Sequence, residues 1–474
     1  MINQETNSKN KNTLKAASWY TISNFVAKVA LYIFTPYYAR VLTSAEYGQY
    51  TNFLSWQSIL VVLMTFDLYS TIAIAYVDYK DEEFDSYISS ISVFSLIVPL
   101  LLSVVPICTI GFFSELTSMR GIHLLMMLFG IVFSSALPIF QTEQRSKVKY
   151  KIASAITLVS AFSNMILTVL LVTVLNDKLN GVIFGGVIAN SIINLGIYFF
   201  IFGRKFSFCK SHISYALKIA LPLIPHALAA TILGSSDKVM INKMCGDEQT
   251  AFYGIIFTCS MVVTLFVTSL NNAWVPWFFS EISDEKYESV KKVSIVTTTL
   301  IGVVAFGLCI VAPEIILIVG GRKYMGAMTL MPPIILSCFF RYVYTLYVNV
   351  EFYLKKTGWI SFGTILTSAT NVVLNYICIK RFGFIAAAYT TLFSNVLLLV
   401  IHVYVVRREN MLKLFNNRMI FLLIAMFSVL CMGSLLLYSN TIIRYTTAAA
   451  ILLASVVVLT IKRQAVRKAI KSLR

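Results

Sequence analysis

Residues 87–112 read YISSISVFSLIVPLLLSVVPICTIGF, an apolar run that contains no charged residue. As an α-helix, a run of this length can cross the roughly 30 Å of hydrocarbon in a bilayer. Similar runs recur along the 474 residues, of which 58% are hydrophobic and only 13% are charged. A soluble domain is nearer half apolar and about a quarter charged. The sequence therefore predicts an integral membrane protein.

The apolar runs predict an all-α fold of about fourteen transmembrane helices. Backbone groups in hydrocarbon must find their hydrogen-bond partners within the segment, which favours helices, and the ten-residue alternation of a membrane barrel is not the pattern here. The predicted spans are 18–39, 50–74, 87–112, 121–142, 152–175, 181–203, 218–241, 250–274, 293–318, 327–350, 358–378, 383–406, 418–438 and 445–461.

Basic residues are divided unequally between the two sides of the predicted membrane. Loops on the side of the N-terminus carry about 27 of the 39 Lys and Arg residues, and the opposite loops carry about nine. Because basic loops stay in the cytoplasm, both termini are predicted to be cytoplasmic. The net charge of +18 lies in short clusters between apolar runs, so we expect no nucleic-acid partner.

The loops are too short for a nucleotide-binding or catalytic domain, and no Walker-type glycine motif is present. The eight cysteines are scattered without a CxxC pair, which argues against a metal site or a disulfide framework. We expect a protein that is not an enzyme and holds no cofactor. Were the protein a transporter without a nucleotide site, a proton or sodium gradient, or later consumption of the transported molecule, would have to give transport its direction.

Several short matches suggest an internal repeat, because they share a separation of about 202 to 207 residues. The matches are Tyr47-Gly48 with Tyr253-Gly254, Ser163-Asn164 with Thr370-Asn371, and Gly181 with Gly383. Repeated bundles around a central site are a usual plan for transporters. The predicted organisation is a six-helix bundle at 1–205, a second at 206–410, and an additional helix pair with a basic tail at 411–474.

The first predicted span concentrates its polar residues on one face. Thr21, Asn24, Lys28, Tyr32 and Thr35 fall within about 80° of one another on a helix. Lys28 lies near mid-span, where a lysine costs about 2.5–3.5 kcal/mol, so it should face protein or water. It would form part of a cationic wall for an anionic substrate or, alternatively, a packing pair with Asp67.

The seventh span carries His226, Asp237 and Lys238, together with Pro222 and Pro225. The prolines should bend this helix, because proline lacks a backbone donor and clashes with the preceding turn. A bent helix with a carboxylate suits gating or ion coupling, although Asp237-Lys238 would equally be an ordinary interfacial pair. His226, like His402 in span twelve, would transfer protons or simply accept and donate hydrogen bonds.

Span ten carries Arg341, Tyr344 and Glu351, loosely on one side. Arginine suits a diphosphate because its planar fork donates two parallel hydrogen bonds, and the alternative is an arginine–carboxylate pair. Asn164, Asn371 and Asn375 are interpreted as interhelical hydrogen-bonding residues. Gly181 and Gly185 form a small-xxx-small pair that predicts close helix packing.

Four segments together resemble the bacterial polysaccharide repeat-unit flippases, the O-antigen and capsule exporters of the multidrug/oligosaccharidyl-lipid/polysaccharide (MOP) superfamily. They are Pro36–Gly48, Phe66–Ala73, Ser236-Asp237-Lys238 leading to Tyr253-Gly254, and Asn272-Ala-Trp274-Val-Pro276-Trp-Phe278-Phe279. The resemblance covers at least residues 15–410, in the right order and spacing. One departure is Tyr69, where the family usually has glycine.

The resemblance implies two six-helix bundles in a V around a hydrophilic cavity. The implied function is to turn undecaprenyl-diphosphate-linked oligosaccharide from the cytoplasmic to the outer leaflet by alternating access, with polysaccharide polymerase and chain-length machinery as expected partners. Lys28 and Arg40 are expected to contact the diphosphate or acidic sugars, and Asn24 and Arg341 are further candidates for substrate binding. The candidates for ion coupling or gating are Asp67, His226, Asp237, Lys238 and Glu351.

Three other functions remain open from the sequence. A drug or metabolite cation antiporter of the same superfamily would favour acidic cavity residues, whereas the candidates here lean basic. A membrane polymerase or ligase would carry a long catalytic loop outside the cytoplasm. A lipid II flippase proper would carry more arginine in its early helices.

Overall fold

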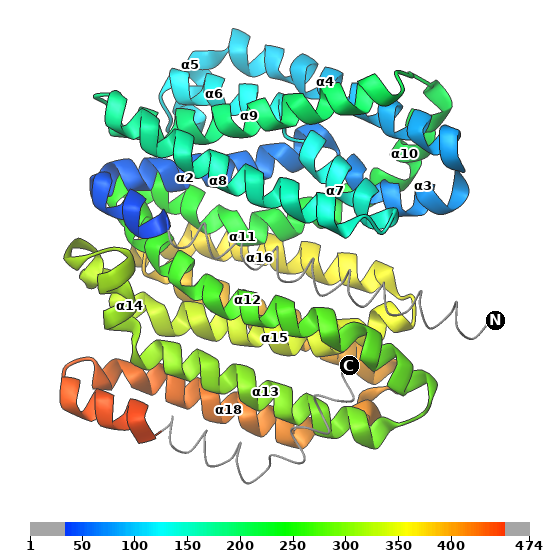
Figure 1. The fold of residues 1–474 in the computed structure, drawn as a ribbon. Coiled ribbons are helices and arrows are strands. Elements are labelled where there is room, and N and C mark those ends of the chain that lie inside the picture. The colour runs from blue at the N-terminus through cyan, green and yellow to red at the C-terminus, as the bar shows by residue number, and fades with distance from the viewer. Residues whose placement is uncertain (1–33, 451–474) are drawn as a thin grey trace. The chain divides into compact units, whose positions relative to one another are not determined.

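The computed structural model describes residues 34–450. By compactness the chain divides into unit 1, Met1–Ala251, and unit 2, Phe252–Arg474. Each is built from helices, most of which lie roughly alongside one another and cross Figure 1 from side to side. A helical segment at 34–41 comes first in unit 1. It is followed by α2 (Ser44–Thr65), η1 (Leu68–Thr71), α3 (Ile72–Asp78), α4 (Asp81–Cys108), α5 (Ile110–Thr117), α6 (Gly121–Phe133), α7 (Ala136–Ser146), α8 (Tyr150–Val174), α9 (Lys178–Arg204), α10 (Lys210–Ala220) and α11 (Ile224–Cys245).

Unit 2 contains the greater part of α12 and all the helices that follow it. These are α12 (Asp247–Ser283), α13 (Tyr287–Ile310), α14 (Ala312–Val319), η2 (Arg322–Leu330), α15 (Met331–Tyr353), α16 (Thr357–Phe382), α17 (Ala386–Arg408), η3 (Leu412–Leu414), α18 (Asn417–Gly433) and η4 (Ser434–Leu437). A last helical stretch runs through 441–450.

The predicted all-α membrane fold is confirmed. Between residues 34 and 450, ten helices are long and apolar enough to span a membrane, or twelve if each of two bent helix pairs forms one span. The first and last predicted spans, 18–39 and 445–461, lie mostly outside the described residues. The total of fourteen therefore stays a prediction.

Two predicted spans of unit 1 are bent by 55°. Between α2 and α3 the bend lies at Phe66 and Asp67, which both adopt left-handed backbone conformations, at φ 53° and 52°. Such a conformation costs a residue other than glycine about 1–2 kcal/mol and ends the helix. Between α10 and α11 the bend follows Pro222, as the sequence predicted, because proline cannot continue the hydrogen-bond ladder.

The two bent spans lie side by side along much of their length. Helix α2 packs along α11 on one side of the bends, and η1 packs against α10 on the other. Asp67 therefore lies at the level where both spans change direction.

Helices α8 and α9 pack closely through small residues, as the sequence predicted. A Cβ atom on Gly185 would lie 2.4 Å from Cα of Thr168, and one on Gly181 would lie 2.8 Å from Cα of Val172. Both contacts are with backbone atoms, which cannot move aside as a flexible side chain would. The glycines are needed here for space.

Substituting Gly185→Ala should therefore destabilise unit 1 by about 1–3 kcal/mol, the usual effect of an extra group in a packed interface. The melting temperature of the detergent-solubilised protein measures this loss. Gly196→Ala on the same helix is the matched control, because its Cβ would meet nothing within 4 Å. Equal melting temperatures for the two variants would contradict the packing account.

At the C-terminal end of α7, a buried carboxylate is held by two permanent cations. Glu143 is fully buried, and its Oε1 lies 2.6 Å from Arg204 Nη1 of α9 and 2.8 Å from Lys147 Nζ. Asp85 of α4 also pairs with both cations, at 3.0 and 3.2 Å. The network joins α4, α7 and α9.

Helices α7 and α15 end in the same left-handed turn, about 207 residues apart. Val148 and Lys355 have φ of 57° and 58°, and in each turn the next residue's N–H bonds back to the carbonyl five residues earlier. The same turn follows α12 at Glu285 and α17 at Asn410, so it is a common helix ending in this chain and does not test the sequence repeat. The bundle boundaries at 205 and 410 stay predictions from that repeat, whereas compactness groups α10 and α11 with unit 1.

Candidate functional site

The predicted substrate-binding residues of the first span are only partly described. Asn24 and Lys28 lie outside the described residues, while Arg40 is exposed at the end of the helical segment 34–41. Asp67 is half-buried at the bend, and its carboxylate accepts a hydrogen bond from Tyr69. The residue that departs from the family's usual glycine therefore holds the carboxylate at the bend.

Helix α11 carries three of the candidates for ion coupling or gating. His226 lies half-buried in its first turn, whereas Asp237 is 2% exposed and interacts electrostatically with the half-buried Lys238. Two residues before Asp237, the hydroxyl of Ser235 hydrogen-bonds that of Ser58 on α2, at 2.9 Å. Asp237 thus lies in the part of α11 that packs against α2, about three helical turns from His226.

The ends of α2, α11 and α12 meet in a group of contacts that we call the latch: Gly48, Gln49, Asn242, Lys243 and Asp247. Asp247 accepts hydrogen bonds from the side-chain amides of Gln49, at 2.8 Å, and Asn242, at 2.7 Å. A Cβ atom on Gly48 would lie only 1.8 Å from the carbonyl oxygen of Asp247. Lys243 Nζ donates to the carbonyl of Glu115, at 2.7 Å. The sequence showed the Tyr47-Gly48 match but not this close approach.

In unit 2, a polar stripe follows neighbouring faces of α12 and α15. Its residues are Thr264, Thr268, Asn272, Arg341 and Thr345, all exposed or half-buried. A contact of 3.9 Å between Thr264 Oγ1 and Cys338 Sγ joins the two helices at one point. A hydrogen bond of 3.0 Å between Asn349 and Asn271 joins them at another. The stripe thus presents hydroxyl, amide and guanidinium groups at mid-span.

Arg341 is exposed near the middle of α15. Among residues 34–450 no carboxylate forms an ion pair with it, so the alternative of an arginine–carboxylate pair has no support there. An arginine at the bilayer centre is costly against lipid and usually faces water or a polar ligand. This face of α15 is therefore suited to water and to an anion.

The motif Asn272–Phe279 divides between packing and the stripe. Trp274 and Phe278 are buried, and their rings stack at 5.3 Å, which anchors this part of α12. Pro276 has no N–H, so the carbonyl of Asn272 loses the helix hydrogen bond it would normally accept. The exposed Asn272 therefore adds an amide to the stripe, and its carbonyl lacks the N–H that position 276 of a helix would normally supply.

Glu351 does not share the exposed face of Arg341. It is fully buried and pairs with the equally buried His402 of α17, with 2.6 Å between Oε1 and Nδ1. The sequence singled out both residues separately and missed the pair, because they are 51 positions apart on different helices. Their only signal was that each is a polar residue in an apolar span.

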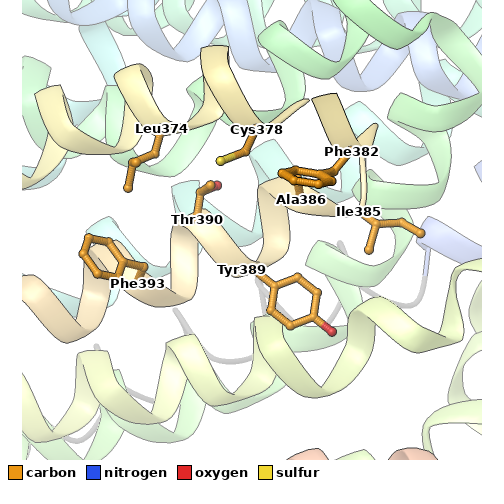
Figure 2. A pocket seen from close by; sticks show the side chains of 8 residues that line it. All are labelled: Leu374, Cys378, Phe382, Ile385, Ala386, Tyr389, Thr390 and Phe393. Carbon is orange, nitrogen blue, oxygen red and sulfur yellow. The ribbon is translucent and has the colours of Figure 1, made fainter. Parts of the chain in front are cut away.

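The asparagines of α16 confirm the interhelical interpretation. Thr390 of α17 donates to Asn375, which donates to Asn371 at 3.1 Å. Beside them lies a groove of about 530 Å³ (Figure 2). It is lined by Leu374, Cys378, Phe382, Ile385, Ala386, Tyr389, Thr390 and Phe393. This largely apolar lining suits hydrocarbon and cannot hold a charged head group.

Known proteins are similar to this chain in both sequence and fold. Residues 13–282 match the family described as polysaccharide biosynthesis protein. A protein of the Lsg locus of Haemophilus influenzae is 20% identical over 380 residues, which cover 76% of this chain and 91% of that protein.

Two solved transporter structures share the fold. Lipid II flippase MurJ in an inward closed conformation has a TM-score of 0.72 at 14% identity, covering 94% of this chain and 99% of MurJ. An inward-facing multidrug resistance MATE family transporter of the MOP superfamily has a TM-score of 0.65 at 12% identity, covering 84% and 97%. With the family match extending over more than half of its residues, this multi-pass membrane chain belongs to the polysaccharide biosynthesis protein family and has the MOP superfamily fold.

Proposed function

We propose that the protein turns an undecaprenyl-diphosphate-linked oligosaccharide from the cytoplasmic to the outer leaflet of a bacterial cytoplasmic membrane. The observation that carries this proposal is the exposed Arg341 at mid-span, with no carboxylate paired to it in the described part. A planar guanidinium suits a diphosphate, and the hydroxyl and amide groups along the stripe suit sugar hydroxyls. The family match to polysaccharide biosynthesis supports the same substrate class.

The physical problem for such a substrate is its charged head. A diphosphate cannot cross hydrocarbon unpaired, because burying an uncompensated charge is prohibitive. A polar stripe at membrane depth would hold the head, while the polyprenyl tail stays in the bilayer. Lys28 and Arg40, which the family resemblance suggests, and Asn24, on the same predicted polar face as Lys28, are further candidates for contacts with the head group.

The latch supplies one of the two closures that alternating access needs. With the N-terminus in the cytoplasm, Gly48, Gln49 and Asp247 lie on the outer side, and their contacts join α2 to the start of α12 there. Opening the latch would expose the head to the outer leaflet. The bends at Asp67 and Pro222 are where the two spans would change direction during this step.

Deleting the gene should make lipid-linked repeat units accumulate on the cytoplasmic leaflet, with little surface polysaccharide. Leaflet-specific labelling of the accumulated glycolipid measures this, and expression of the wild-type chain should reverse it. Unchanged polysaccharide with altered drug tolerance would instead indicate a cation antiporter.

A further inference from the structure

The buried pair Glu351–His402 joins α15 to α17 inside unit 2. Both side chains are fully buried and share one hydrogen bond of 2.6 Å. Within the described part of the chain, Oε2 of Glu351 and Nε2 of His402 have no hydrogen-bond partner. Ionisable residues buried in a membrane span are costly, and their presence there usually serves a function.

The partner of Glu351 distinguishes it from the other buried glutamate of the described chain, Glu143. Glu143 is neutralised by Lys147 and Arg204, which stay charged throughout the physiological pH range. Among the described residues, the side chain of Glu351 pairs only with that of His402, an imidazole that has a neutral as well as a cationic form. Neutralisation of Glu351 therefore depends on a proton.

The charge of the pair depends on whether the surrounding helices close around it, which we call the sealed state, or open and let water reach it. Sealed without an additional proton, Glu351 and a neutral His402 would carry one uncompensated negative charge, which a low-dielectric site disfavours strongly. One proton, shared between Oε1 and Nδ1, makes the pair neutral overall. In water at neutral pH a glutamate is ionised and most histidines are neutral, so opening the site releases that proton.

The pair is closely packed and offers too few ligands for Ca²⁺ or Mg²⁺, whereas a proton needs neither space nor further ligands. Gly363 of α16 covers the ring, since a Cβ there would lie 2.8 Å from Nε2 of His402. Tyr344 contacts the same ring, with centroids 4.8 Å apart. Ca²⁺ and Mg²⁺ take about six or more oxygen ligands, whereas the pair offers one carboxylate and one imidazole.

Other charged groups lie farther along the same helices. Tyr344 interacts electrostatically with both Glu351 and Arg341, so it connects the pair to the polar stripe. Lys356 pairs with Glu409 at 3.4 Å, at the ends of the helices, and each partner compensates the other. Arg408 lies over the ring of Trp359, at 5.6 Å.

We propose that Glu351 and His402 form a proton-binding site that takes up one proton when α15, α16 and α17 seal around it and releases the proton when they open. The proton comes from and returns to the solution that reaches the opened site. The link from this proton to transport rests on the proposed function, while the proton binding itself does not. Acidic solution should favour the sealed state, by up to about tenfold per pH unit above the range where histidine titrates.

The test uses purified full-length protein in nanodiscs without substrate. Hydrogen–deuterium exchange of the last turns of α15 and α17 is measured at pH 6 and pH 8 and corrected for the intrinsic rates. In the wild type these turns should be more protected at pH 6, by tenfold or more. Glu351→Gln keeps the pair neutral without the proton, so its protection should be the same at both pH values.

Glu143→Gln is the matched control, because it removes a buried carboxylate whose partners stay charged. It should lower stability and keep the wild-type response to pH. A wild-type protein without the pH response, or a Glu351→Gln protein that keeps it, would overturn the proposal. The wild-type measurement decides even if a variant does not fold. This experiment contains no substrate. If deletion of the gene caused no accumulation of lipid-linked repeat units, the proposed transport function would be wrong, but the pH dependence of the exchange would still show proton binding.

Discussion

Replacing Arg341 with alanine should reduce export of lipid-linked repeat units by at least about 30-fold. Removing one partner of a desolvated, hydrogen-bonded charge pair costs about 2–5 kcal/mol, and each 1.4 kcal/mol is a factor of ten. Arg341→Lys keeps the charge but loses the planar fork, so it should recover only part of the rate. Flipping of a labelled glycolipid in proteoliposomes measures the rate directly.

Arg120→Ala is the control for a general loss of positive charge. Arg120 is exposed and pairs with Asp177 at 2.7 Å, and such a surface pair contributes about 0–1 kcal/mol. Its removal should leave export within about twofold. Because Arg341 is also exposed, Arg341→Ala should melt close to the wild-type temperature. Normal flipping by Arg341→Ala would show that the stripe does not bind the head group.

Hydropathy and composition predicted most of the fold because membrane helices are set by local length and apolarity. The same kind of reasoning found the close packing at Gly181 and Gly185, which needs only a spacing of four residues. It missed the bend at Phe66 and Asp67, where neither residue is glycine or proline. The segment that follows this left-handed turn packs against α7 and α10. Contacts of this kind cannot be predicted from the residues that neighbour the turn in the sequence.

The sites were harder to predict, because they depend on which helices meet. The sequence identified Arg341 as polar within a span but left open whether a carboxylate neutralises it. It likewise placed Glu351 with Arg341, whereas the structure turns Glu351 inward to His402. The roles of Lys28 and Asn24 stay predictions, since both residues lie outside the described part.

Gly48→Ala should prevent the latch from closing and reduce export at least tenfold. Its Cβ would lie 1.8 Å from the carbonyl oxygen of Asp247, a backbone atom, so α2 and α12 must separate there. That separation breaks the 2.8 Å hydrogen bond from Gln49 to Asp247 and favours the state open on the latch side. The effect is on the balance of conformations, so the variant should still fold.

Cysteines at positions 58 and 235 report whether the latch is closed, because the two serine hydroxyls they replace are 2.9 Å apart. Oxidation should link Ser58→Cys to Ser235→Cys readily in an otherwise wild-type chain and poorly in Gly48→Ala. Gly111→Ala is the control, since its Cβ would meet nothing within 4 Å, and it should cross-link normally. The contradicting outcome is a Gly48→Ala protein that cross-links and exports like the wild type. In that case the latch does not close the outer side of the transport path, and the contacts at Asp247 serve only to hold the helices together.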